Sequence, residues 1–443
     1  MKNARKIALI AAGAVAGTGL AAYCAAVELF TAQALNRRQP GTRLREAREA
    51  LRLRLENAGN GVAGPAAGNG GDGLNAGDRE GEAAETVRGM EADGAGEAPF
   101  DLPATRNAGG AAERGDAPEP EAELAHGSEG EGAGIFGSDL DSEEVQAAAQ
   151  RLRQSPSERV TVTAADGTRL AGHWREQPGA RRVILAMHGW RGSWYRDFAL
   201  VSSFWEAQGC SVLYAEQRGQ GESGGAHLGF GARERYDCLT WIDWINARTG
   251  AALPLYLAGI SMGATTVLLC AGLEVPDNVR GIMADCGFTS PEAIWKHVLE
   301  HDYHLPYGLF RRAVTRRTAP LLGCRPDACS TVEALRESAL PVLLVHGLAD
   351  DFVPPEMSRE NFAASAASHK RLLLVPGAKH GMSYAVDRKG YEEQVLSFWA
   401  ELERPEGERP EGECPEGERP EGNCQNGDFP KEAGDAQDTG PEP

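Results

Sequence analysis

Seven short apolar segments, separated by stretches of helical character, constrain the fold of this chain more than any other feature. Several are continuous apolar runs, which is typical of strands covered on both faces. Strands that alternate with helices predict a mostly parallel sheet with helices on both sides, an α/β fold. The strand candidates are residues 160–163, 183–187, 212–215, 255–258, 281–284, 342–345 and 372–375, and the helical candidates include 232–246, 264–273, 356–367 and 388–402.

Composition divides the chain into four expected parts. Residues 1–35 are mainly apolar, and residues 151–402 hold the α/β domain. Residues 36–150 are basic and then rich in Gly, Ala and Glu, and too few of them are apolar to offset the entropy of ordering, so we expect a flexible tether. Residues 403–443 repeat near-identical Pro, Glu and Gly pentads, which predicts a disordered acidic tail.

Acidic residues gather in the tether and the tail. Residues 66–144 hold 20 acidic side chains against 4 arginines, and residues 403–443 hold 13 against 4 basic ones. Together they exceed the formal net charge of −19, so the α/β domain carries no excess of acid. The sequence also lacks a basic stripe with interleaved aromatic residues, which argues against a nucleic-acid partner.

The N-terminal part contains an uncharged apolar run from Ile7 to Val27 behind a basic start. At 1.5 Å per residue this run is long enough to cross about 30 Å of hydrocarbon. We expect a membrane anchor, with a cleaved signal sequence and a secreted protein as the alternative. The signal-like start favours an extracytoplasmic domain, whereas the arginines within residues 37–54 favour the cytoplasmic side.

Nine cysteines are present, without a C-x-x-C pair, which indicates neither a zinc site nor a disulfide framework. Cys210, Cys270 and Cys286 lie in apolar runs and are expected to be small core residues. Cys324 and Cys329 are close enough in sequence to bridge in an oxidising compartment. The sequence leaves open whether they do.

Residues 259–263, Gly-Ile-Ser-Met-Gly, form a G-x-S-x-G pattern. In a chain with 55 glycines this pattern alone is weak. Here it follows a strand candidate and precedes a helical one, which is the arrangement of a nucleophile elbow. The elbow requires glycines because the strained serine backbone brings neighbouring chain too close for side chains. We therefore predict that Ser261 is a nucleophile.

A serine hydroxyl needs a base to remove its proton, and that base needs a carboxylate to hold it in one tautomer. Asp350 and Asp351 follow the strand candidate at 342–345, and His380 follows the one at 372–375. The order Ser, Asp, His at strand ends fits the elbow. We predict His380 as the base and Asp350 as the acid, with Asp351 as the alternative.

On these residues the chain from about 159 to 401 resembles the α/β-hydrolase superfamily. The closest likeness is to bacterial, often membrane-anchored hydrolases grouped with serine aminopeptidases and lysophospholipase-like esterases, and it extends to residues 284–290 and 294–297. The family pattern H-G-x-x-D-x-x-V-P implies that Asp350 is the acid. Some relatives use the position of Asp285, which makes it a third candidate.

The resemblance also implies the oxyanion donors. They are the backbone N–H groups of Met262, directly after the nucleophile, and of Trp190, in a loop of the form H-G-x. His188 and His346 are expected to fix loops rather than to act as bases. Residues 216–223, Glu-Gln-Arg-Gly-Gln-Gly-Glu-Ser, resemble a structural turn of the family, with Glu in place of its Asp, and not a dinucleotide site.

A small helical lid is expected after the sixth strand, at about residues 291–338. His297, His301 and His304 are spaced for a metal on a helix, but no further ligands complete a site, so we expect lid polarity and no metal. The side chains expected to line an apolar substrate wall are Trp295, Tyr303, Leu305, Tyr307, Leu309 and Phe310.

We therefore expect a serine hydrolase that acts through an acyl-enzyme on a small-molecule carboxylic ester, as a carboxylesterase or lysophospholipase-like enzyme without a cofactor. A serine aminopeptidase-like peptide or amide hydrolase is the alternative, because the same triad serves both reactions. A third hypothesis is an inactive hydrolase fold that serves as a surface-binding module. The sequence does not specify an oligomeric state.

Overall fold

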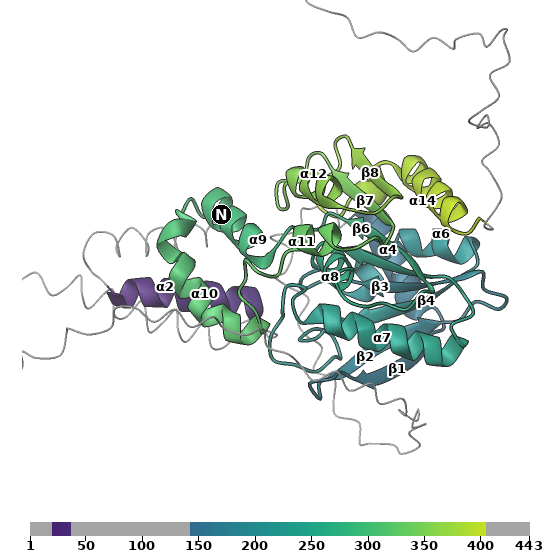
Figure 1. Ribbon diagram of the computed structural model, residues 1–443, viewed down its shortest axis with the longest axis horizontal. Coiled ribbons are helices and arrows are strands. Elements are labelled where there is room, and N and C mark those ends of the chain that lie inside the picture. The colour runs from purple at the N-terminus through teal and green to yellow at the C-terminus, as the bar shows by residue number, and fades with distance from the viewer. Residues whose placement is uncertain (1–19, 37–141, 405–443) are drawn as a thin grey trace, which may run out of the picture. The chain divides into compact units, whose positions relative to one another are not determined.

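Eight strands form a single sheet in the computed structural model, which describes residues 20–36 and 142–404 (Figure 1). The strand order is β1-β2-β4-β3-β5-β6-β7-β8, and the neighbours from β4 onward are parallel. All seven expected strands are present, and the mostly parallel sheet confirms the predicted fold class. The strands are β1 (Glu158–Thr163), β2 (Arg169–Arg175), β3 (Arg182–Met187), β4 (Cys210–Glu216), β5 (Leu255–Ile260), β6 (Val279–Asp285), β7 (Val342–Gly347) and β8 (Lys370–Val375).

The strand that sequence reasoning missed is β2, which pairs antiparallel with both β1 and β4. Its sequence, Arg-Leu-Ala-Gly-His-Trp-Arg, mixes apolar residues with glycine and charge, so neither an apolar run nor a clean alternation marks it. The hairpin with β1 turns at Gly167, which has a φ of +82°. Pairing with two neighbours, rather than local propensity, makes this segment a strand.

Helices cover both faces of the sheet because successive side chains of the central strands point to opposite faces. On β3, Val183, Leu185 and Met187 pack in one core with α7 (Glu234–Thr249) and α8 (Met262–Cys270). Ile184 and Ala186 pack in a second core with α6 (Val201–Ala207) and α14 (Arg388–Leu402). The short or peripheral helices are α5 (Trp194–Asp197), α12 (Pro355–Ala364) and α13 (Ser383–Val386).

Helix α4 (Glu143–Gln154) spans the expected boundary at residue 150 between tether and domain. Its first turn is capped by the Ser142 hydroxyl, which accepts a hydrogen bond from the Val145 N–H. Val145 and Ala149 pack against Ala199, and Leu152 enters the second core. This burial stabilises the helix beyond the propensity of its alanine-rich sequence.

The chain between β6 and β7 forms a helical insertion, which corresponds to the expected residues 291–338. It contains α9 (Pro291–His297), the π-helix η3 (Val298–Asp302), α10 (Tyr307–Leu322) and α11 (Thr331–Arg336). Its apolar side chains form a third core that also includes Trp190 and Met262. The insertion therefore lies against the predicted nucleophile elbow.

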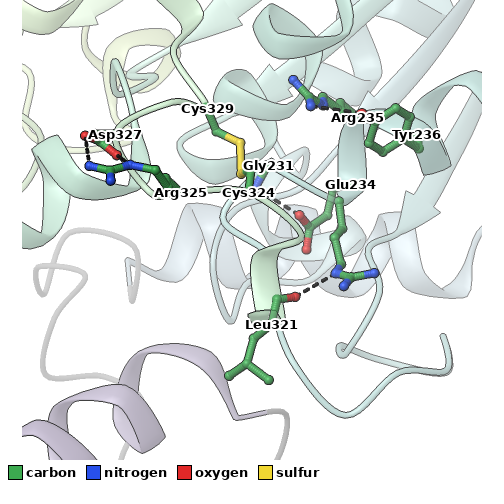
Figure 2. Close-up of a disulfide and its surroundings, with 10 residues drawn as sticks. Gly231, Glu234, Arg235, Tyr236, Leu321, Cys324, Arg325, Asp327 and Cys329 are labelled. Atoms are coloured by element: carbon green, nitrogen blue, oxygen red, sulfur yellow. Dashed lines mark hydrogen bonds and ion pairs between the residues drawn. A yellow bond between two sulfur atoms is a disulfide. The ribbon is translucent and has the colours of Figure 1, made fainter. Parts of the chain in front are cut away.

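Cys324 and Cys329 form a disulfide in the loop between α10 and α11 (Figure 2). The bridge answers the question that the sequence leaves open. Inside the bridged loop the Arg325 guanidinium donates to the Asp327 carboxylate at 2.9 Å. Cys210, Cys270 and Cys286 are buried, as expected for small core residues, and Cys238 is buried as well.

Helix α2 (Leu20–Leu35) holds the part of the N-terminal segment that the structure describes. It lies beside α10, and Ala26, Val27, Ala34 and Leu35 are buried in the third core (Figure 1). No described helix is both long and apolar enough to span a membrane. Most of the expected anchor, the tether up to residue 141 and the tail from residue 405 lie outside the described residues.

Candidate active site

Ser261 lies in a sharp turn between β5 and α8. Its φ of 56° and ψ of −118° are strained for a residue with a side chain. A Cβ atom on Gly263 would lie 1.8 Å from the Met187 carbonyl oxygen, and one on Gly259 would lie 2.3 Å from the Gly263 backbone. Both glycines of the G-x-S-x-G pattern are therefore required by close backbone packing, as the sequence predicts.

Ser261, His380 and Asp350 are joined by two hydrogen bonds. His380 Nε2 lies 2.9 Å from Ser261 Oγ, and His380 Nδ1 lies 2.7 Å from Asp350 Oδ2. The residues come from the ends of β5, β8 and β7, whose carboxyl ends meet at one edge of the parallel sheet. This geometry allows a proton to pass from the serine hydroxyl to an imidazole that the carboxylate holds in one tautomer.

The two alternative acids do not contact His380 in this way. Asp351 is exposed, and its backbone oxygen lies 3.1 Å from His297 Nε2. Asp285 is buried, and its Oδ1 accepts a hydrogen bond from the Ser383 hydroxyl at 3.0 Å. Among the three candidates, Asp350 is the one that the structure brings to the histidine.

The loop after β3 lies against the nucleophile. A Cβ atom on Gly189 would lie 3.3 Å from the Ser261 Cβ, and the Asp197 carboxylate accepts the Gly189 N–H at 2.7 Å. Trp190 follows in this loop, while Met262 is the first residue of α8. Both predicted oxyanion donors therefore belong to the backbone around Ser261, and Met262 adds the positive end of the helix dipole.

A family model described as serine aminopeptidase, S33, matches residues 178–304, which include β3, β5 and Ser261. The strand order, the elbow after β5, and the acid and histidine after β7 and β8 agree with the arrangement that this match implies.

The chain has an α/β-hydrolase fold.

This α/β hydrolase is similar to several curated bacterial proteins. It is 24% identical to the uncharacterized protein YqkD of Bacillus subtilis over 56% of this chain and 81% of that protein. It is 27% identical to the uncharacterized protein YfhR of Escherichia coli K12 over 56% of this chain and 83% of that protein.

Solved structures similar to the hydrolase include two described as esterases. The Pyrococcus furiosus esterase Pf2001 is 21% identical, with a TM-score of 0.45 over 56% of this chain and 93% of that one. An acetyl xylan esterase from Paenibacillus sp. R4 is 19% identical, with a TM-score of 0.42 over 58% and 92%.

The two buried carboxyl groups near His380 differ in electrostatics. Burial opposes ionisation of Asp350, but the charge of His380 and hydrogen bonds from His346, His380 and the Val353 N–H outweigh it, so the pKa of Asp350 lies well below its usual range. Burial dominates at Asp285 and raises its pKa to about 6, despite the Ser383 hydrogen bond. At neutral pH both carboxyl groups are mainly ionised, but the pKa of Asp285 lies closer to neutrality than that of Asp350.

His188 and the turn at 216–223 are structural, in agreement with the sequence. The Gln217 N–H donates to His188 Nε2 at 3.2 Å, and His188 Nδ1 lies 2.9 Å from the Gly189 carbonyl oxygen. Glu216 accepts hydrogen bonds from His173 at 2.9 Å and from the Glu222 N–H. Glu216 thus holds the turn closed through the Glu222 N–H.

The third core contributes the apolar surroundings of the elbow. Trp295, Leu305, Tyr307 and Phe310, all expected to line an apolar wall, are buried there, whereas Leu309 is 56% exposed. Phe230 and Phe288, which the sequence analysis did not select, join Trp190 and Met262 in the same core. They come from loops that no local pattern marks as part of the site.

The three histidines of the insertion do not form a metal cluster. His297 stacks on His301 at 4.9 Å between ring centroids, and His301 Nδ1 lies 2.9 Å from the Asp302 carboxylate. Within the described residues, the group close enough to hold a metal is Cys286, Asp350 and His380. Two of its members are the hydrogen-bonded acid and histidine, so it overlaps the Ser261 site rather than forming a separate centre.

Sequence reasoning missed two side chains that support the site. His346 Nε2 lies 3.2 Å from Asp350 Oδ2 and 2.9 Å from the Val353 carbonyl oxygen. Asp197 holds the loop of Trp190 through the Gly189 N–H. The sequence predicts that His346 fixes its loop but gives no sign that it contacts Asp350. Asp197 lies in the short helix α5, where no motif marks it.

Proposed function

We propose that the protein is a serine hydrolase that cleaves carboxylic esters through an acyl-enzyme. The observation that carries the proposal is the hydrogen-bonded series Ser261, His380 and Asp350 on a strained elbow. A serine without a neighbouring base would not be activated in this way. Burial of the three side chains strengthens the electrostatic interactions among them.

In the proposed reaction His380 Nε2 takes the proton of Ser261 as Oγ attacks the ester carbonyl carbon. The Met262 and Trp190 N–H groups stabilise the oxyanion of the tetrahedral intermediate. The intermediate collapses, the C–O bond to the alcohol breaks, and His380 returns the proton to the leaving oxygen. Water, deprotonated by His380, then attacks the acyl-enzyme and releases the acid and free Ser261.

The apolar lining supports esters with an apolar acyl part as the substrate class. Trp190, Phe230, Phe288 and Trp295 belong to the apolar core that also contains Met262, directly after the nucleophile. Apolar walls bind hydrocarbon and leave the reacting carbonyl as the polar part of the substrate.

A peptide or amide hydrolase is the second candidate, because a hollow beside the elbow is lined by two acids. Asp197 and Asp285 line it together with Ile260 and Gly381, which flank the nucleophile and the histidine. Two carboxylates near a reacting centre are suited to a substrate amine. Both acids already accept hydrogen bonds, from Gly189 and Ser383, which favours the ester reading.

Labelling with a fluorophosphonate tests the proposal. The wild-type chain, Ser261→Ala and a control, Ser330→Ala at the N-cap of α11, are treated with the probe and then assayed on p-nitrophenyl esters and aminoacyl anilides. We expect labelling and ester turnover in the wild type and control, and neither in Ser261→Ala. Turnover of anilides alone would assign the aminopeptidase reaction, and a folded chain inert to the probe and both substrates would assign the binding module.

We also propose that the N-terminal segment anchors the hydrolase to a membrane, with the folded domain outside the cytoplasm. The apolar run from Ile7 to Val27 supports the anchor, and the disulfide between Cys324 and Cys329 fits an oxidising compartment. Extraction of cell membranes with alkaline carbonate tests the anchor, and protease digestion of intact spheroplasts tests the side. Release into the medium would instead indicate a cleaved signal sequence.

A further inference from the structure

Helix α2 packs into the same apolar core that surrounds the nucleophile elbow. Leu35 is fully buried and Ala34 is nearly so, in one core with Trp190, Met262 and Trp295. Phe30 lies edge-on to Trp295 at 6.2 Å between ring centroids. An N-terminal segment thus fills apolar space beside Ser261, which is itself only 2% exposed.

The last turn of α2 is tied to the loop that holds the predicted oxyanion donor. Trp190 Nε1 donates to the Ala34 carbonyl oxygen at 2.9 Å, and the Arg191 guanidinium donates to the Gln33 carbonyl oxygen at 2.8 Å. The Leu228 N–H donates to the Leu35 carbonyl oxygen at 2.7 Å. The last carbonyl groups of α2, which have no partner within the helix, thus accept hydrogen bonds from residues near Ser261 rather than from a local cap.

Other polar groups, at the contact of α2 with the insertion and with the loop after β3, are less well paired. Thr31 Oγ1, Trp295 Nε1 and Arg191 Nε are buried, and none has a hydrogen-bond partner among the described residues. Glu28 and Arg317 form an exposed ion pair at 2.9 Å, and Gln33 Nε2 lies 3.5 Å from the partly buried Tyr303 hydroxyl. Exposed ion pairs of this kind add little to stability.

We propose that the apolar space occupied by α2 is the binding site for the acyl chain of the substrate, and that α2 is an intramolecular competitor for that site. A long apolar acyl chain takes the place of α2 against Trp190 and Trp295 when α2 leaves, and a short acyl group does not reach it. The inference rests on the proposed ester hydrolysis at Ser261. It adds a substrate class, esters of long apolar acids, and a means of regulation through the N-terminal segment.

Competition makes a specific kinetic prediction. A competitor raises the apparent KM of the ligand whose site it occupies and leaves kcat unchanged. Substitution of Phe30 by Asp removes the contact with Trp295 and places a charge in the apolar contact, which favours the undocked state. For p-nitrophenyl decanoate we expect KM to fall about tenfold in Phe30→Asp, with kcat within about twofold. For p-nitrophenyl acetate we expect both parameters to stay within about twofold.

The experiment uses the full chain in micelles of a non-ionic detergent, at one fixed detergent concentration for all variants. Leu396→Asp, at a 39% exposed position on α14, is the matched control and should leave both substrates unchanged. Thermal unfolding is recorded for each variant to show that the domain remains folded. A KM for the decanoate that is unchanged in Phe30→Asp, or that rises, would overturn the proposal, since a rise makes α2 part of the acyl wall.

A cross-link that holds α2 in its docked position tests whether the docked helix excludes the decanoyl chain. Glu28→Cys and Arg317→Cys are introduced into a chain that also carries Cys24→Ser, Cys414→Ser and Cys424→Ser. The two new thiols are joined by a short bismaleimide. The cross-linked chain should lose at least about fivefold in kcat/KM for the decanoate relative to the same chain with blocked thiols. An unchanged value would overturn the proposal. Fluorophosphonate labelling of Ser261 in all variants separates this outcome from a failure of the proposed function, in which no variant reacts.

Discussion

His346 and His380 share one oxygen atom of Asp350. His380 Nδ1 lies 2.7 Å from Asp350 Oδ2, and His346 Nε2 lies 3.2 Å from the same atom. The Val353 carbonyl oxygen, which accepts only, lies 2.9 Å from His346 Nε2, so that nitrogen carries the proton. His346 is therefore a donor that fixes the acid, in the loop where the sequence placed it.

Replacement of His346 by Phe should weaken both the fold and the reaction. Loss of the donor leaves Asp350 less well held, and we expect kcat to fall about ten- to a hundredfold with KM nearly unchanged. The free energy of unfolding should fall by about 1–3 kcal/mol, because the Ser358 hydroxyl and the Val353 carbonyl lose a buried partner. Steady-state kinetics and urea denaturation measure the two effects.

Ser358→Ala is the matched control for His346, because it removes the 2.6 Å bond to His346 Nδ1 and leaves the contact with Asp350 in place. We expect kcat to change less than threefold in this variant. An equal loss of kcat in both variants would show that His346 acts only by supporting its loop.

Asp350→Asn and Asp351→Asn separate the two acids that the sequence left as alternatives. Asp350→Asn should lower kcat by about 10³- to 10⁴-fold, because an amide permits the wrong tautomer of His380. Asp351 is exposed and meets His297 through its backbone, so Asp351→Asn should keep kcat within about threefold. Ester turnover at pH 8 decides between them, and a large loss in Asp351→Asn would contradict the assignment.

Asp285 should make stability depend on pH in a defined direction. Its pKa is 3.8 in the unfolded reference and about 6 in the fold, so between these values the unfolded chain releases a proton that the folded chain keeps. Stability therefore falls as the pH rises from about 4 to 6, by up to about 3 kcal/mol at 1.36 kcal/mol per pKa unit.

Asp285→Asn removes this dependence. We compare the free energy of unfolding of the variant with that of the wild type at each pH. This difference should be about 2–3 kcal/mol more favourable to the variant at pH 7.5 than at pH 4. Urea denaturation at the two pH values gives the difference. A constant difference between the variants at both pH values would mean that burial does not raise the pKa of this carboxyl.

Gly263→Ala tests the packing of the elbow. Its Cβ would lie 1.8 Å from the Met187 carbonyl oxygen, and backbone cannot move away cheaply, so we expect more than about 3 kcal/mol of destabilisation or no soluble protein. Gly308→Ala in α10 is the control, because nothing lies within 4 Å of its Cβ. That change should stabilise the chain by up to about 1 kcal/mol, as measured by thermal unfolding.

Local chemistry made much of the site readable from the sequence. Apolar runs revealed the central strands because buried parallel strands must be apolar on both faces, and the glycines around Ser261 revealed the elbow because no other residue fits there. Asp350 and His380 were identifiable because each follows a strand at the same edge of the sheet.

Tertiary structure alone decided the rest. It made β2 a strand through its two neighbours, chose Asp350 over Asp351 and Asp285 through distances to His380, and paired Cys324 with Cys329. It also placed α2 against Trp190 and Trp295, although the apolar sequence suits lipid equally well. The physical reason is that the chain records which surfaces must leave water, whereas the partners that bury them are fixed only when distant segments meet.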